Sequence, residues 1–431
     1  MRVCFVLQDL TLSGGVGVVV EHAYHLAEEH GFDVTLAVVE HHHGRWSYPR
    51  IDGVHVVTLE EAIASSFDVA VATWWRTAYR IFEVPAKRYA YFVQSMEDRF
   101  YRDDEVDRVQ AAVTHDLPLA FITEARWIAE TLGELRPDAP CHYVRNGVAK
   151  DVFASPEEVE PRTTGPLRIL VEGHPELWLK AVPEALAATT LMCEPREVTL
   201  VSGIRHEARI DDAAVDRVIG PLSAHEMAGA YAESDVVLKL SRVEGMFGPP
   251  LEGFHMGATC VVSPVTGHDE YVVHGWNGVV TAWDDPKGTA RWLDVLARDR
   301  HLLHRLRWNA RKTAESWPSW SQASAFMAAA LRDIAAGPAP EPRGGAHQMV
   351  GDVLAASERL RNERIMLEHL VRERDRRALR ELEQAELRYV ALTQTRAYRV
   401  GVLLRERIWK HPFVRALTLP LRVARRLARR G

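Results

Sequence analysis

Short apolar runs alternate with amphipathic stretches through about the first 330 residues of this 431-residue chain, and this alternation limits the fold more than any other feature. The runs at 2–7, 68–73 and 119–123 have the length of buried strands, and 16–31 has apolar positions at helical spacing. Alternating strands and helices build a parallel sheet with both faces covered. Because a single hydrophobic core stops growing near roughly 250 to 300 residues, we expect this chain to form more than one core.

Two polar stretches divide the chain. Residues 150–166 are rich in acids, Pro and Thr, and residues 335–348 combine Pro, Gly and Ala, both without a strand or helix period. We therefore expect an α/β protein with two doubly wound, Rossmann-like domains at 1–150 and 166–334, followed by a flexible linker at 335–348.

The pattern changes beyond this linker. Apolar residues at spacings of 3 and 4 predict a coiled coil over 349–395, although Ser357, Arg364 and Asp375 fall on core positions and leave a long solvated helix as the alternative. Residues 396–431 carry eleven Lys or Arg against one acid, in a chain whose net charge is -6. Apolar residues interleave with these arginines, which predicts a basic amphipathic tail that binds an anionic membrane surface. The alternative is that the tail packs on the acidic body or on a second subunit.

The composition argues against several classes of protein. The four cysteines form no CxxC pair, so neither a disulfide framework nor a zinc knuckle is indicated. No run of about 18 or more apolar residues occurs, and the short N-terminal run leads into a glycine loop and not into a signal-peptide cleavage site. An acidic body argues against nucleic-acid binding. We expect a cytoplasmic protein, peripherally associated with the inner face of the plasma membrane.

The segment 244–280 is the most informative one for function. It places Glu244 and Glu252 eight residues apart, with glycines and two prolines between them. A helix that begins near Pro249 presents free backbone N–H groups that attract phosphate, and the glycines let a ligand approach the backbone closely. Carboxylates before and inside the helix can accept hydrogen bonds from hydroxyl groups, so the arrangement fits a nucleotide sugar. The alternative is that both carboxylates merely cap and solvate a helix.

This pattern of Glu, seven residues and Glu on a Gly-Pro loop resembles the signature of retaining family 4 glycosyltransferases of GT-B fold. The resemblance implies that the two domains face each other across a cleft, with the donor held mainly by the second and the acceptor by the first. It places Glu244 at the donor sugar, as the catalytic candidate, and Glu252 at the ribose. The loop that would contact sugar and phosphate comprises Gly245, Met246, Phe247 and Gly248.

The family also carries an Arg or Lys pair after the first strand of its second domain, which neutralises the diphosphate as the leaving group develops charge. Lys180 matches the Lys of that pair, whereas His174 stands where the family usually has Arg. A neutral imidazole donates one hydrogen bond where a guanidinium donates a fork, so either His174 is protonated in use or another base substitutes for it. The alternative for Lys180 is a solvated lysine at a helix start. We expect no metal or other cofactor.

Two stretches of the first domain add weaker candidates. A glycine loop that contains Gly14 and Gly15 resembles the Gly-Gly loop that family 4 enzymes turn toward the cleft, which implies contact with phosphate or acceptor. Residues 91–101 are similar to a segment of polysaccharide rhamnosyltransferases of the WsaF type, and they offer Gln94 and Glu97 as acceptor contacts, with an ordinary polar loop as the alternative.

The histidines at 41–43 follow a strand without matching acids. A solvated loop is therefore favoured there over a metal site.

These features predict a glycosyltransferase that transfers a sugar from a nucleotide diphosphate sugar to a growing bacterial surface glycan or lipid-linked acceptor, with a homo-oligomer through the coiled coil as a further expectation. A non-catalytic scaffold that organises glycan assembly is the main alternative, supported by His174 and opposed by Glu244, Glu252 and Lys180. An epimerase or a phosphorylase of the same fold is a third possible function. The sugar, base and acceptor depend on pocket shape, which no motif encodes.

Overall fold

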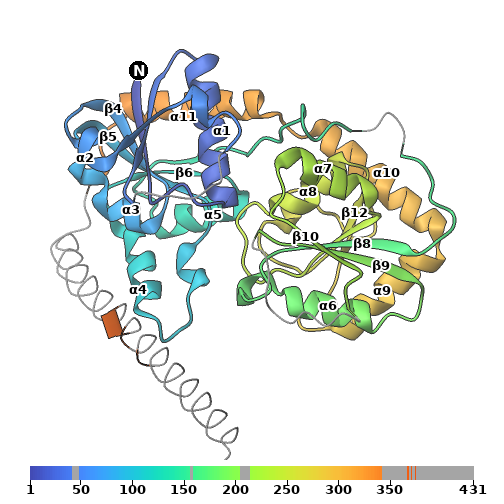
Figure 1. The fold of residues 1–431 in the computed structure, drawn as a ribbon. Helices are drawn as coiled ribbons and strands as arrows, with labels where there is room; N and C mark the ends of the chain where they lie inside the picture. The colour runs from blue at the N-terminus through green and yellow to red at the C-terminus, as the bar shows by residue number, and fades with distance from the viewer. Residues whose placement is uncertain are drawn as a thin grey trace, which may run out of the picture. The chain divides into compact units, whose positions relative to one another are not determined.

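The computed structural model describes residues 1–40, 48–155, 159–203 and 214–341, together with Met366, Leu367, Leu370 and Arg374 (Figure 1). The chain divides into two compact units, Met1–Gly351 and Asp352–Gly431, and the fold below is that of the first. The histidines at 41–43, the rest of the expected coiled coil and the basic tail lie outside the described residues.

The first domain is a parallel sheet of seven strands in the order β3-β2-β1-β4-β5-β6-β7 (Figure 1). The strands are β1 (Arg2–Leu7), β2 (Asp33–Val38), β3 (His55–Thr58), β4 (Phe67–Ala72), β5 (Ala86–Val93), β6 (Ala120–Thr123) and β7 (Cys141–Tyr143). The helices between them are α1 (Gly14–Glu28), α2 (Leu59–Ile63), α3 (Trp75–Arg80), α4 (Val106–Val113) and α5 (Arg126–Leu135). The strand order reverses between β1 and β4, the place in such sheets where ligands commonly bind.

The second domain is a parallel sheet of six strands in the order β10-β9-β8-β11-β12-β13. The strands are β8 (Leu167–Glu172), β9 (Arg196–Val201), β10 (Arg217–Ile219), β11 (Val236–Lys239), β12 (Thr259–Val262) and β13 (Val279–Val280). The helices are α6 (Val182–Thr190), α7 (Ala224–Glu233), α8 (Gly248–His255), α9 (Pro286–Arg298) and α10 (Arg300–Ser316). Helices α6 and α9 cover one face and α7, α8 and α10 the other, so the prediction of two doubly wound sheets is confirmed (Figure 1).

The helix α11 (Trp320–Ala336), which the sequence analysis placed in the second domain, packs on the first sheet (Figure 1). Its side chains Met327 and Leu331 are buried in one core with β1 and α1. His22 of α1 hydrogen-bonds Ser324 of α11 at 3.2 Å. An amphipathic pattern shows that a helix has an apolar face, but it does not show which sheet covers that face.

His22 generates a prediction about stability and pH. The ring is fully buried between the rings of Phe92 and Trp320, and burial lowers its pKa to about 3. The folded protein therefore keeps His22 neutral between pH 6.5 and about 3, whereas the unfolded chain takes up the proton, so the free energy of unfolding falls with pH across this window. Between pH 7 and pH 5 this one group removes about 2 kcal/mol.

Urea unfolding of wild type and His22→Gln at both pH values measures this contribution. The variant should lose about 2 kcal/mol less than wild type between pH 7 and pH 5. An equal loss in both proteins would show that His22 does not carry the effect.

Candidate active site

Lys180 and Glu244 meet at the carboxyl edge of the second sheet. Lys180 ends a short turn, Trp178–Lys180, that follows β8, and Glu244 lies in the loop after β11, the neighbour of β8 in the sheet. Lys180 Nζ donates to Glu244 Oε1 at 2.9 Å. Parallel strands present their carboxyl ends at the same edge, so two residues that the sequence analysis selected separately lie in direct contact.

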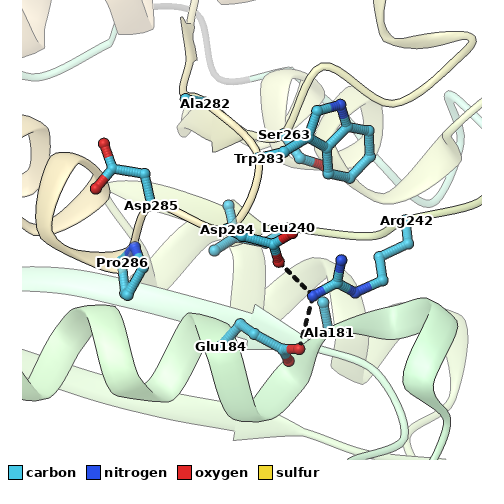
Figure 2. A pocket seen from close by; sticks show the side chains of 10 residues that line it. All are labelled: Ala181, Glu184, Leu240, Arg242, Ser263, Ala282, Trp283, Asp284, Asp285 and Pro286. Carbon is cyan, nitrogen blue, oxygen red and sulfur yellow. Dashed lines mark hydrogen bonds and ion pairs between the residues drawn. The ribbon is translucent and has the colours of Figure 1, made fainter.

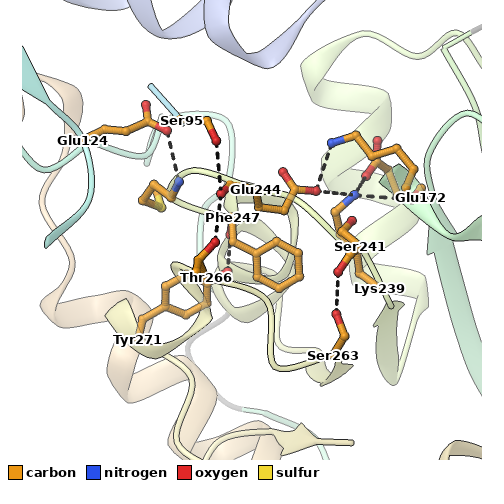
Figure 3. A network of polar contacts seen from close by, with 12 residues as sticks. Ser95, Glu124, Glu172, Lys239, Ser241, Glu244, Phe247, Ser263, Thr266 and Tyr271 are labelled. Carbon is orange, nitrogen blue, oxygen red and sulfur yellow. Dashed lines mark hydrogen bonds and ion pairs between the residues drawn. The ribbon is translucent and has the colours of Figure 1, made fainter. Parts of the chain in front are cut away.

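Two residues that the sequence analysis missed complete this charge cluster. Lys239 is the last residue of β11, and Glu172 is the last residue of β8 (Figure 3). The Lys239 ammonium forms an ion pair with Glu172 and lies 3.7 Å from Glu244 Oε1. The signal that could have found it is a lysine within the apolar run at 236–240, because a charge in a buried strand requires a partner.

The two lysines decide the charge state of Glu244. Burial alone would raise the pKa of Glu244, but the ammonium groups of Lys180 and Lys239 outweigh it and hold the pKa below its ordinary value. The cluster thus keeps an ionised carboxylate at a largely buried position, where the side chain of Glu244 is 13% exposed. Such a group can stabilise positive charge that develops nearby.

Glu252 lies inside α8, as the sequence predicted. Its pKa is shifted in the direction opposite to that of Glu244. Burial raises its pKa to about 7, and a hydrogen bond with Tyr231 of α7 opposes this only in part. Near neutral pH the Glu252 carboxyl therefore holds a proton more readily than an exposed carboxyl does. It can donate a hydrogen bond as well as accept one.

The loop between the two glutamates is held by hydrogen bonds to residues of both domains. Phe247 has a left-handed backbone with φ of 51°, and its carbonyl accepts from the Tyr271 hydroxyl (Figure 3). The helix α8 then begins at Gly248, with a proline in its first turn as expected. The Met246 amide, which the resemblance placed against the donor, instead donates to Glu124 of the first domain at 3.1 Å.

Gly245 allows this loop to approach the first domain closely. A Cβ at this position would lie 1.7 Å from the backbone carbonyl oxygen of Gln94 and 2.7 Å from Glu124 Oε1. Its own carbonyl accepts from Trp127 Nε1 at 3.1 Å. The glycine is therefore required by contact between two backbones, in addition to any approach by a ligand.

Glu124 is a further group that the sequence analysis missed. Burial raises its pKa to about 7, although hydrogen bonds from the side chain of Asn146 and the amide of Met246 oppose the shift. The nearby charges of Glu244 and Glu270 add to it. A carboxyl group at the end of β6 thus holds the loop that carries Glu244 (Figure 3).

The first-domain candidates are placed differently from one another. The side chain of Gln94 lies beside the glycine loop, since a Cβ at Gly15 would lie 3.3 Å from Gln94 Oε1, whereas a Cβ at Gly14 would meet open space. Glu97 is 2% exposed and accepts from the Tyr91 hydroxyl and from a backbone amide, both at 2.6 Å. Burial raises its pKa to about 8. Glu97 is thus engaged inside the first domain and is not presented to an acceptor.

His174 is partly buried in the segment between β8 and Lys180. Its Nδ1 accepts from the Glu176 amide at 3.1 Å, so the neutral ring carries its proton on Nε2. A neutral imidazole has a single N–H, whereas a guanidinium has a fork of donors.

A depression that is partly open to solvent lies at the same edge of the sheet (Figure 2). Arg242 on its wall forms ion pairs with Glu184, at 3.0 Å, and with Asp284. Trp283, also on the wall, is 42% exposed. None of the predicted site residues lines this depression.

Within the described residues, no group of three or more His, Cys, Asp or Glu side chains is placed to hold a metal ion. Among the same residues, no helix has both the length and the apolar character needed to cross a membrane.

Comparison with known proteins agrees with the fold. Residues 165–299 match the family described as glycosyl transferases group 1. No curated protein sequence matches the chain. The match covers the second domain from β8 through α9, and therefore includes Lys180, Glu244 and Glu252.

Several solved structures share the two-domain architecture. A sucrose-phosphate synthase from Thermosynechococcus elongatus is 12% identical, with a TM-score of 0.63 over 78% of this chain and 99% of its own. HepE from Anabaena, in complex with UDP-glucose, is 12% identical, with a TM-score of 0.62 over 78% of this chain and 100% of its own. The lipopolysaccharide outer core galactosyltransferase WaaB is 12% identical, with a TM-score of 0.57 over 77% of this chain and 99% of its own. At these identities the likeness is one of fold, and the fold is the GT-B fold of glycosyltransferases.

Gly245→Ala tests the close approach of the loop to the first domain. The added methyl group cannot fit 1.7 Å from the Gln94 carbonyl oxygen, so the free energy of unfolding should fall by about 1 to 3 kcal/mol. Gly229→Ala is the matched control, because Gly229 lies inside α7 with open space around it and should gain about 0.5 to 1 kcal/mol. Denaturant unfolding measures both. Equal behaviour of the two variants would contradict the contact.

Proposed function

We propose that this protein transfers a sugar from a nucleotide diphosphate sugar to a bacterial surface glycan or a lipid-linked acceptor. The observation that carries the proposal is the contact of Lys180 with Glu244 beside the N-terminus of α8. An ammonium and helix-terminal amides suit a diphosphate, and the carboxylates of Glu244 and Glu252 suit sugar and ribose hydroxyl groups. The match of residues 165–299 to the group 1 glycosyl transferases supports this, as does the likeness in fold to a protein that binds UDP-glucose.

The proposal includes retention of the sugar's configuration and independence of metal ions. Retention rests on the resemblance to family 4 enzymes. Independence of metal rests on Lys180 and the amides at the start of α8, which can neutralise the charge that develops on the leaving diphosphate. Glu244, kept ionised between two lysines, would stabilise the positive charge that develops on the sugar in the transition state.

A non-catalytic scaffold remains the second candidate. The observation that favours it is that a histidine, His174, stands where the family usually has Arg. A scaffold, however, has no use for a buried and ionised Glu244, whose burial costs free energy.

Site variants test the proposed reaction. Lys180→Ala should weaken the binding of the cognate nucleoside diphosphate, chosen from UDP, GDP and dTDP, by about 10-fold or more, because it removes a charge-assisted contact. Glu244→Gln should bind the nucleotide nearly as wild type does and lose about 10-fold to 100-fold in turnover, because its charge matters most in the transition state. Calorimetry and nucleotide release from the donor measure the two effects.

Lys87→Ala serves as the control for loss of a lysine, since Lys87 is exposed on the first sheet and pairs with Asp68. Unchanged binding in Lys180→Ala would show that the site is misassigned. Full turnover in Glu244→Gln would show that Glu244 is not the catalytic group. No turnover in wild type would favour the scaffold.

We further propose that the tail at 396–431 holds the protein at the inner face of the plasma membrane, close to a lipid-linked acceptor, and that the segment 349–395 joins it to a second copy. The support is the sequence alone, namely eleven basic residues interleaved with apolar ones. Each basic residue near an anionic surface contributes about 1 kcal/mol at most, so several together give reversible binding that salt weakens.

Liposome sedimentation tests the tail. The full-length protein should pellet with vesicles that contain phosphatidylglycerol at low salt, and less so at high salt. A chain that ends at Pro338 should stay in the supernatant and still bind the nucleotide. If the full-length protein ignores anionic vesicles at low salt, the tail is a protein-interaction element.

A further inference from the structure

One oxygen of Glu244 faces two ammonium groups that differ in their surroundings. Lys180 Nζ lies 2.9 Å from Glu244 Oε1 and Lys239 Nζ lies 3.7 Å from the same atom. The side chain of Lys180 is 27% exposed, whereas that of Lys239 is 1% exposed. One lysine can therefore reach a ligand, and the other cannot.

The buried position of Lys239 is unusual for a sheet of this kind. Its strand β11 lies between β8 and β12, and all four of its residues are buried, three of them valine or leucine. An apolar side chain at 239 would extend this core, whereas an ammonium must be desolvated and paired there. The pairing is supplied by Glu172 and, at longer range, by Glu244.

Donor binding would separate the two lysines. A diphosphate carries more negative charge than one carboxylate, so a bound nucleotide sugar would attract the accessible ammonium of Lys180 away from Glu244. A largely buried carboxylate that loses its nearest cation tends to take up a proton. It would then lack the charge that the transition state needs.

We propose that Lys239 is a positioning residue for sugar transfer, which keeps Glu244 ionised and oriented while Lys180 binds the diphosphate of the donor. Glu172 holds the Lys239 ammonium in place, so this cation stays with the cluster when Lys180 leaves it. The inference rests on the proposed function. Lys239 acts through Glu244 and does not itself touch the donor.

The competing role for Lys239 is that of a clamp. Its ion pair with Glu172 joins the ends of β8 and β11 and would stabilise the second domain without any effect on Glu244. A double-mutant cycle separates the two roles, because residues that act through each other are not additive.

The experiment compares wild type, Lys239→Gln, Glu244→Gln and the double variant. Lys239→Gln should bind the cognate nucleoside diphosphate within about twofold of wild type, because the ligand contacts Lys180. Its turnover at pH 7 should fall about tenfold, as expected if the pKa of Glu244 in the complex then lies about one unit above the assay pH, and should recover toward wild type at pH 9. In the Glu244→Gln background, the same change should alter turnover by less than about twofold.

A second variant and a second measurement are available if Lys239→Gln does not fold or if turnover cannot be measured. Lys239→Met places an apolar side chain of similar length in the strand, in case Lys239→Gln does not fold. Carbon-13 NMR of labelled glutamate in the nucleotide complex, assigned with Glu244→Gln, should show that the pKa of Glu244 is higher in Lys239→Met than in wild type.

A loss of turnover that is the same at every pH and in both backgrounds would show that Lys239 is only a clamp. An unchanged pKa of Glu244 in Lys239→Met, or wild-type turnover in Lys239→Gln, would also overturn the proposal. Failure of the proposed function looks different, since wild type would then bind none of UDP, GDP and dTDP, or would bind one of them without any turnover.

Discussion

The parallel pairing of β8 with β11 is the constraint on which the candidate site depends. Residues that end two adjacent parallel strands emerge at the same edge of the sheet, and here these are Glu172 and Lys239. Their ion pair anchors an ammonium in the sheet, and the loop after β11 returns Glu244 to it. The turn after β8 brings Lys180 into contact with Glu244. The cluster of two lysines and two glutamates is therefore a consequence of strand order.

A second constraint is the close approach of the Glu244 loop to the first domain. Gly245 leaves room for the Gln94 carbonyl, Glu124 accepts from the Met246 amide, and Trp127 donates to the Gly245 carbonyl. The residue that precedes this glycine is the proposed catalytic carboxylate. Its position thus depends on groups from both domains, whereas the two ammonium groups that keep it ionised both belong to the second domain.

Local patterns predicted the elements of both sheets because strand and helix periods are properties of neighbouring residues. The start of α8 is an example, since its glycine and proline carry the helix signal within a few residues. The same reasoning assigned α11 to the second domain and offered Glu97 to an acceptor. Both assignments depended on what lies opposite an apolar face or a carboxylate, and that information is not in the local pattern.

The sequence by itself determined that this chain contains two doubly wound sheets, and it selected Lys180, Glu244 and Glu252 as candidate donor contacts. The tertiary structure alone decided that Lys180 and Glu244 touch, that Lys239 and Glu172 join them, and that Glu124 and Gln94 support the loop. The physical reason is that the charge and orientation of a buried group depend on its neighbours in space. In a parallel sheet those neighbours come from strands that lie far apart in the chain.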